Sequence, residues 1–293
     1  MNVLLATDGS QPAKEGEMLV KSLFKRDIKI NVFTVAPEPQ NDWLLAENNL
    51  ELVRMDMPVL GEDQIAAEAA ERFAGEGFEA DSSASRGAPG PEILRQLDKQ
   101  GADVVVLGAS HNTWMGNLLL GSVSTFVLHH APCSVLIAHR APTEAGTILF
   151  GADGSEHANA ALSLATKLLD ASRCSFHIAT VVIDPWVSVA VYPPGPPFGS
   201  AGQYRKLERK RMEDGWRVVE RASTPLRERG FKVEGAVLAG NTTHQLLKES
   251  DNIAADLVVV GSRGLGPVRR TLLGSVSDQL VRYGPATLVG RFT

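Results

Sequence analysis

A glycine-rich stretch at residues 261–277, GSRGLGPVRRTLLGSVS, holds the groups of this chain best suited to bind an anion. It follows the apolar run DLVVV, which predicts a buried strand, and it leads into a predicted helix. The start of that helix presents unpaired backbone N–H groups of Ser275, Val276 and Ser277, and the helix dipole favours a phosphate there by about 0.3–1 kcal/mol. The hydroxyls of Ser275 and Ser277 can add hydrogen bonds. The stretch therefore predicts a phosphate cradle.

Other residues of the stretch fit the same chemistry. Gly261, Gly264 and Gly274 would let the backbone approach a ligand closely or adopt a positive φ. The pattern is not a P-loop, since no G-x-x-x-x-G-K-[S/T] occurs, and it is not the dinucleotide fingerprint, which follows the first strand of its domain. A glycine-rich turn without a ligand is the alternative that spacing alone allows. Three arginines add positive charge beside Ser262: Arg263, Arg269 and Arg270.

An internal repeat places a second, altered copy of this stretch earlier in the chain. LLATDGS at residues 4–10 returns as LFGADGS at 149–155. LLGSVS at residues 119–124 returns unchanged at 272–277. Because only two long copies occur, the repeat predicts a domain duplication and not a solenoid.

The length of 293 residues fits two domains, each large enough for its own core. We expect one domain at residues 1–139 and another at 147–293, joined by a linker at about 139–146. The second copy carries extra residues, and the proline- and glycine-rich segment 192–200 is their expected place because it suits neither a helix nor a central strand.

Composition excludes several classes of protein. The net charge of −5 argues against a general nucleic-acid binder. Two cysteines, Cys133 and Cys174, do not suggest a disulfide framework. The N-terminus lacks the features of a signal peptide, and no apolar run approaches the roughly 20 residues of a membrane span. We therefore expect a cytoplasmic protein without a membrane partner.

Strand and helix signals alternate in both copies, which predicts an α/β fold with parallel sheets covered by helices on both faces. Ser155 is placed to cap the first helix of copy two. In such sheets a ligand binds beyond the carboxyl ends of the strands, where the cradle lies. The expected strands of copy two are residues 147–152, 175–183, 231–238, 256–260 and 286–290, and its other expected helices are 203–229, 242–251 and 275–283.

These motifs resemble those of the universal stress protein family. Gly261, Gly264 and Gly274-Ser275 fit its ATP-binding signature G-x2-G-x9-G-[S/T], and D-G-S follows the first strand of each copy. The resemblance implies two domains, each with a five-stranded parallel sheet in the order 3-2-1-4-5, which contact each other through their fifth strands around a pseudo-two-fold axis.

The resemblance also implies a ligand. Asp153 and the backbone around Val182 would hold the adenine and ribose of ATP. The segment from Gly261 through Ser262 and Arg263 to Gly264 would follow the triphosphate, and Gly274 to Ser277 would bind its end. Mg²⁺ would accompany the phosphates.

Copy one departs from the signature at one position. Gly108 and Gly121-Ser122 are in place, followed by Val123 and Ser124, and Asp8 and Val35 stand where the base would be held. His111 replaces the second glycine. Site one is then a weakened ATP site, a site in which His111 faces phosphate, or a site that has lost its ligand.

Function follows from the resemblance. It implies a nucleotide-responsive regulator in the stress response, with an adenine nucleotide as ligand, an unidentified regulatory protein as partner and a homo-oligomer as one assembly. Slow ATP hydrolysis or phosphotransfer is the enzymatic alternative, although no catalytic base or Walker-type lysine is apparent. An interaction scaffold with a structural nucleotide is the third class.

Overall fold

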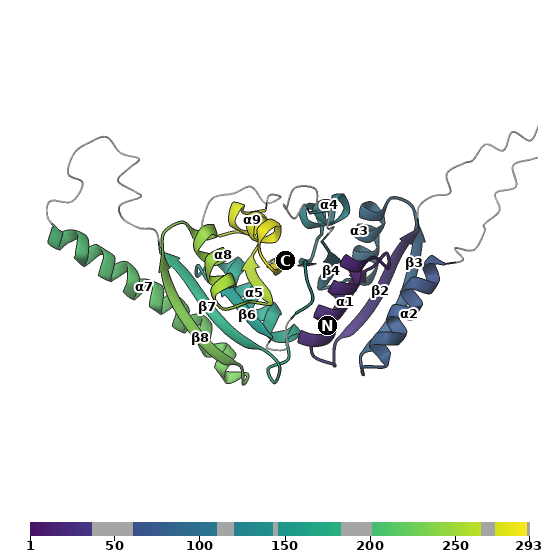
Figure 1. Cartoon of the computed structure of the whole chain (residues 1–293), viewed down its shortest axis with the longest axis horizontal. Coiled ribbons are helices and arrows are strands. Elements are labelled where there is room, and N and C mark those ends of the chain that lie inside the picture. The colour runs from purple at the N-terminus through teal and green to yellow at the C-terminus, as the bar shows by residue number, and fades with distance from the viewer. Residues whose placement is uncertain (37–60, 110–119, 143–145, 183–200, 265–272, 292–293) are drawn as a thin grey trace, which may run out of the picture.

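The computed structural model describes residues 1–36, 61–109, 120–142, 146–182, 201–264 and 273–291 (Figure 1). Strands and helices alternate in both copies. Copy one contains β1 (Asn2–Ala6), α1 (Gln11–Leu23), β2 (Lys29–Ala36), α2 (Glu62–Ala74), β3 (Glu79–Arg86), α3 (Pro89–Gln100), β4 (Val104–Gly108), α4 (Ser122–His130) and β5 (Ser134–Ala138). Copy two contains β6 (Thr147–Gly151), α5 (Glu156–Leu168), β7 (Ser175–Val182), α7 (Ala201–Glu228), β8 (Lys232–Ala239), α8 (Thr242–Asn252), β9 (Leu257–Gly261), α9 (Ser275–Tyr283) and β10 (Ala286–Gly290).

All ten strands form one sheet, in the order β3-β2-β1-β4-β5-β10-β9-β6-β7-β8. Within each copy the paired strands are parallel. Counted along each copy, the order is the 3-2-1-4-5 that the family resemblance implies. The α/β prediction is therefore confirmed, and so is the alternation of strands with helices.

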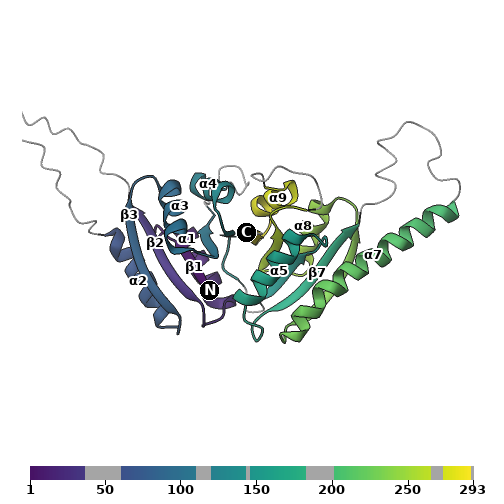
Figure 2. The same ribbon diagram turned by 180° about the vertical axis from the view of Figure 1, so that it is seen from behind.

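Burial explains why the strands are nearly continuous apolar runs. Alternate residues of each strand face opposite sides of the sheet, and both sides are covered, so both sets must be apolar. In β1, Val3 and Leu5 pack with α1 and α2, whereas Leu4 packs with α3 and α4. Copy two repeats this arrangement with α5 and α7 on one face and α8 and α9 on the other. Figure 2 shows α2 and α7 on the outer flanks of the two copies.

The two copies meet through their fifth strands, as predicted. β5 and β10 pair antiparallel, with Leu136 opposite Leu288. The residue after each of these strands reaches the other copy: His139 Nε2 lies 2.6 Å from the carbonyl oxygen of Val281, and the Arg291 guanidinium donates to the carbonyl of Leu128. The pairing is thus reinforced at both ends by contacts between equivalent positions.

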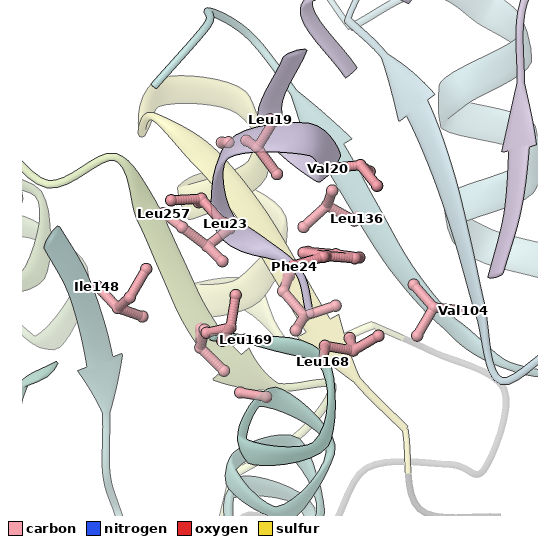
Figure 3. Close-up of a cluster of buried hydrophobic side chains, with 14 of the residues drawn as sticks. Leu19, Val20, Leu23, Phe24, Val104, Leu136, Ile148, Leu168, Leu169 and Leu257 are labelled. Carbon is pink, nitrogen blue, oxygen red and sulfur yellow. The ribbon is translucent and has the colours of Figure 1, made fainter. Parts of the chain in front are cut away.

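A second contact between the copies joins the ends of α1 and α5. Phe24 and Leu169 form an antiparallel bridge, and their neighbours exchange backbone hydrogen bonds of 2.8 Å (Lys25 N to Leu168 O) and 2.9 Å (Asp170 N to Leu23 O). The side chains around the bridge gather in one buried cluster drawn from both copies (Figure 3). The hydrophobic core therefore runs across the junction between the copies, which we call the seam.

Element boundaries agree closely with the sequence. The long charged helix expected at residues 203–229 is α7 at Ala201–Glu228. Ser155 caps α5 as expected, because its side chain accepts a 3.1 Å hydrogen bond from Ala158 N. The expected insertion at 192–200 and the residues His111, Arg269 and Arg270 lie outside the described residues.

Candidate nucleotide-binding site

A pocket of about 690 Å³ lies at the carboxyl ends of the strands of copy one. Three segments form much of its wall: the end of β1 with the turn that follows it, the end of β4, and the start of α4. Apolar side chains of β2 and α3 complete the lining. Seven of the residues that the sequence singled out in copy one line this pocket: Asp8, Val35, Gly108, Gly121, Ser122, Val123 and Ser124.

The turn after the first strand has the same construction in both copies. Asp8 Oδ1 accepts a 3.0 Å hydrogen bond from Ser10 N, and Asp153 Oδ1 accepts one of 2.9 Å from Ser155 N. The glycine between them has a positive φ, of 75° at Gly9 and 77° in copy two, a conformation that favours glycine. The D-G-S motif is therefore a turn that leaves the second carboxylate oxygen of the aspartate available to a ligand.

The sequence did not identify several pocket residues. Phe33, Ile93 and Pro12 all line the pocket, and the buried Phe33 contributes apolar wall on the strand expected to hold the base. Their only signal is position: Phe33 lies two residues before Val35 on the same face of β2, and Pro12 begins the helix after the D-G-S turn.

The first glycine of each motif is required by packing. A Cβ on Gly108 would lie 2.3 Å from the backbone of Pro12, and a Cβ on Gly261 would lie 2.7 Å from the backbone of His157 and Ala158. The strand end and the helix start thus touch backbone to backbone. This glycine lets the first helix approach the fourth strand, whether or not a phosphate binds there.

The last serine of each G-S-V-S motif is engaged within the protein. Ser124 Oγ donates a 2.8 Å hydrogen bond to Gly108 O, and Ser277 Oγ donates one of 2.7 Å to Gly261 O. Both serines are buried. Since a hydroxyl has one proton to donate, neither can also donate to phosphate in this arrangement, and their contribution to a ligand is the backbone N–H. Ser122 and Ser275, by contrast, are exposed at the helix starts.

In copy two the start of the loop after β9 lies against Asp153. A Cβ on Gly264 would be 2.8 Å from Asp153 Oδ2. Gly264 does not have a positive φ, so that expected reason for this glycine does not hold, and a side chain here would instead meet the carboxylate of Asp153. Gly274 N donates to Ser262 O at 2.8 Å, which ties the two ends of the loop together. The loop thus begins and ends beside the aspartate and the start of α9.

The residue of copy two that matches Val35 is Val181. Thr34 Oγ1 donates to Thr7 O at 2.8 Å, and Thr180 Oγ1 donates to Ala152 O at 2.9 Å, so these two threonines are equivalent. Val182 is then the equivalent of Ala36. The Val182 side chain lies near Gly215 of α7, and its carbonyl accepts a hydrogen bond from Gly240.

Copy two also has a histidine that copy one lacks. His157, at the position of Pro12, lies with Nδ1 3.4 Å from Ser262 Oγ. Gln11 is replaced by Glu156, and Phe33 by Ala179. Among the described residues, the site of copy two is therefore more polar and has alanine where copy one has Phe33.

Cysteine chemistry does not contribute to either site. Burial raises the pKa of the Cys133 thiol to about 11 and that of Cys174 to about 12, so both thiols stay protonated and unreactive near neutral pH. Among the described residues there is no group of three or more metal-ligating side chains. The helices that the structure describes include none long and apolar enough to cross a membrane.

Comparison with known proteins agrees with this architecture. Residues 1–139 and 144–289 each match the model of the Universal stress protein family. A universal stress protein of Mycolicibacterium smegmatis is 33% identical over 187 residues, which cover 62% of this chain and 58% of that protein. One of Mycobacterium tuberculosis is 29% identical over 202 residues, covering 67% and 63%. The chain thus spans about three fifths of the length of the curated relatives it matches.

A solved structure extends the likeness to the whole fold. The crystal structure of a universal stress protein from Archaeoglobus fulgidus superposes with a TM-score of 0.65 at 21% identity, covering 99% of this chain and 98% of that one. At this identity the match supports the fold alone. Together with the two family matches, the repeated D-G-S turns and the paired fifth strands, it shows that the chain belongs to the universal stress protein family, with two of the family's domains in tandem.

Proposed function

We propose that the chain binds an adenine nucleotide, ATP with Mg²⁺, at the strand ends of its copies and acts as a nucleotide-responsive regulator in the stress response. The observation that carries the proposal is the pocket of copy one, which is lined by seven of the residues that the sequence predicts for a nucleotide site. It combines an apolar wall for a base, a carboxylate at Asp8 for a ribose hydroxyl, and a helix start for phosphate. Copy two keeps the full glycine signature, so we propose a second site there.

The residues present suit a magnesium ion that is held mainly by the nucleotide. Mg²⁺ is commonly bound through one or two carboxylates together with substrate phosphates and waters. Each site offers an aspartate after its first strand, Asp8 or Asp153, with one oxygen in the turn hydrogen bond, and copy two adds Glu156 at the position of Gln11. Mg²⁺ would neutralise phosphate charge, while the helix N–H groups of the chain position the phosphates.

The test is a calorimetric titration of ATP and Mg²⁺ into the full chain. We expect a dissociation constant in the micromolar range, about 8 kcal/mol of binding free energy. cAMP, which has the base but a single cyclic phosphate, separates base recognition from phosphate recognition. Gly274→Val should weaken site two, because its Cβ would lie 3.3 Å from Ser262 O and crowd the loop at the helix start. Absence of binding at millimolar ATP would overturn the proposal.

The two copies can be separated with matched variants. Asp8→Asn and Asp153→Asn each change one carboxylate without altering its size, so each should reduce affinity at its own site only. A stoichiometry of two that falls to one in either variant supports two sites. Unchanged affinity and stoichiometry in both folded variants would contradict the assignment of these aspartates to a ligand.

Slow hydrolysis is a second candidate function, favoured by one observation. His157 is an imidazole beside the loop of copy two, 3.4 Å from Ser262 Oγ, and histidine is the commonest general base. If copy two hydrolyses ATP through it, His157→Gln should remove phosphate release and leave ATP affinity nearly unchanged. Phosphate release that persists unaltered in this variant would exclude His157 as the base. Gln11→Glu gives copy one the carboxylate that copy two has at Glu156. This variant shows whether the added charge alone changes phosphate release.

A regulator also requires a partner. We propose that the nucleotide changes the affinity of the chain for a regulatory protein or for a second copy of itself. Light scattering with and without ATP tests self-association. If the molecular mass in solution does not change with ATP, self-association is not the response, and the proposal then requires a separate protein partner.

A further inference from the structure

A second pocket, of about 440 Å³, lies on the seam between the copies. Copy one contributes Lys25, Asp27 and Asp103, together with Met1, and copy two contributes Thr166, Lys167 and Arg229. Asp103 precedes β4 and Thr166 lies near the end of α5. The pocket therefore opens at the amino ends of the strands, on the edge of the sheet opposite to the proposed nucleotide sites.

The floor of this seam pocket is built around one buried threonine. Thr166 is 2% exposed. Lys25 Nζ donates a 2.9 Å hydrogen bond to its carbonyl, and Arg229 Nη1 donates one of 2.6 Å to its hydroxyl. An ammonium has three N–H donors and a guanidinium has five. Each cation is thus held in place by a neutral oxygen and keeps further donors.

The duplication supplies an internal comparison for this pocket. The bridge at the seam relates Lys25 to Asp170, because each donates its backbone N–H across to the other copy. By the same relation Thr166 corresponds to Lys21. Arg229 corresponds to Glu76, since each precedes a glycine of positive φ and then a buried phenylalanine. The equivalent cleft on the other side of the seam therefore has different charges at every one of these positions.

In that equivalent cleft the cations are paired with acids. Lys21 Nζ lies 3.2 Å from Glu76 Oε1, Arg26 Nη2 lies 3.5 Å from Glu76 Oε2, and Arg173 Nε lies 3.8 Å from Asp170 Oδ2. Arg26 also donates to the carbonyl of Lys21 at 2.8 Å, the place of the bond from Lys25 to Thr166. The carbonyls of Thr166 at the end of α5 and of Lys21 at the end of α1 each accept a hydrogen bond from a cation. In the equivalent cleft the cations are also paired with acids.

The seam pocket lacks this neutralisation. Among the residues that the structure describes, no carboxylate oxygen lies within 4.0 Å of Lys25, Lys167 or Arg229. Its two acids, Asp27 and Asp103, are exposed at the rim. Asp103 Oδ2 is engaged by Asn2 N at 2.8 Å. Three cations from both copies thus converge on a pocket without an acidic partner in contact.

We propose that the seam pocket binds a phosphate group, either free or carried by a small metabolite. Lysine and arginine are the side chains that bind phosphate most strongly, through charge-assisted hydrogen bonds. A phosphate here contacts Lys25 of copy one and Lys167 and Arg229 of copy two. It therefore links the copies and stabilises the folded chain by mass action.

The experiment uses calorimetry with pyrophosphate on the full chain carrying Gly274→Val, so that the cradle of copy two contributes little. We expect binding that falls about tenfold or more in Lys167→Glu, because an attractive charge becomes repulsive. Lys167 is exposed, so this variant should fold normally. The double variant Lys25→Met with Arg229→Met should also lose binding. Circular dichroism and thermal melting check that each variant is folded.

The matched control lies in the equivalent cleft. Arg173→Met removes an exposed cation that is paired with Asp170, and it should leave pyrophosphate affinity unchanged. Inorganic phosphate and glycerol phosphate are titrated in separate arms; tighter binding of the ester assigns the pocket to a metabolite, and equal or weaker binding assigns it to the free ion. An affinity that is the same in Lys167→Glu and its parent, or that falls as much in Arg173→Met, would overturn the proposal. Loss of ATP binding at the strand ends would not affect it.

Discussion

The two copies of this chain share the construction of their strand ends and differ in the lining of the site. Gly108 and Gly261 bring a strand end against a helix start, and Ser124 and Ser277 bond that strand end to the following helix. The walls differ instead: Phe33 faces the pocket of copy one, whereas copy two has alanine at that position.

Part of the binding signature is required by the fold and not by a ligand. The residues that are identical in both copies include those that hold the backbone together, so their presence indicates the scaffold. The residues that differ, such as Pro12 against His157, can alter a ligand without altering the fold. A glycine signature alone therefore does not rank the two sites.

The largest expected effect concerns the shared glycine. Gly108→Val and Gly261→Val should each lower the free energy of unfolding by about 3 kcal/mol, because the new side chain overlaps the backbone of the neighbouring helix. Urea denaturation measures both. Gly75→Ala, whose Cβ would lie 3.4 Å from Glu71 O, is the control with little effect. A Gly261→Val variant that keeps its stability but loses ATP would show that this glycine serves the ligand instead.

A smaller effect is expected at the shared serine. Ser124→Ala and Ser277→Ala should each reduce stability by about 1–2 kcal/mol, since the part-buried carbonyl of Gly108 or the buried carbonyl of Gly261 loses its hydroxyl donor. ATP affinity should change less than stability does. If Ser277→Ala abolishes ATP binding while its stability equals that of the unmodified chain, the Ser277 hydroxyl serves the ligand and not the fold.

A partly buried polar group distinguishes the copies on the α3 and α8 side of the sheet. In copy two, His177 Nε2 lies 2.9 Å from Glu249 Oε1. At the equivalent place in copy one, Ser83 Oγ donates to Asn31 Oδ1 at 2.8 Å and Gln96 Nε2 donates to Ser83 Oγ at 3.1 Å. A histidine–carboxylate contact thus replaces a chain of neutral hydrogen bonds.

Exchanging these groups sharpens the comparison. Glu249→Gln alone should destabilise the chain by about 1 kcal/mol, whereas His177→Asn with Glu249→Gln and Ala236→Ser, which copies the neutral group, should recover most of that loss. Chemical denaturation of the single and combined variants gives the coupling free energy between the substituted positions. Strictly additive losses would show that the two groups are not interchangeable.

The smallest effect concerns the thiols. Burial raises the pKa of Cys133 to about 11 and of Cys174 to about 12, above their ordinary value of 9.0. As pH rises, the thiols of the unfolded chain ionise at a lower pH than those of the folded chain. The contribution of the protonated thiols to the free energy of unfolding is therefore complete below pH 9 and is lost as pH rises above it. Iodoacetamide at pH 8 should label the folded chain far more slowly than the chain in urea. Equal rates would show that a thiol is accessible.

The site was predictable in part because its signals are local. The D-G-S turn needs a glycine of positive φ, and the G-S-V-S motif begins a helix, so both can be recognised from short stretches. Phe33 and Ile93 come from β2 and α3, and nothing in their local sequence marks them as pocket residues. The equivalence of Val35 with Val181 comes from the matched bonds of Thr34 and Thr180, and it matters because neighbouring residues of a strand face opposite sides of the sheet.

The α/β class, the duplication and the element boundaries could be predicted from sequence, because hydrophobic periodicity and turn chemistry are written in consecutive residues, and the family followed from the resemblance of its motifs to a known signature. The arrangement of the elements in space sets which residues share a pocket, that Gly108 and Gly261 serve backbone packing, and that the three cations of the seam pocket have no acid in contact among the described residues. These facts depend on distances between segments far apart in the chain. Lys25 and Arg229 are brought together by strand order and by the pairing of the two copies, which no local pattern encodes.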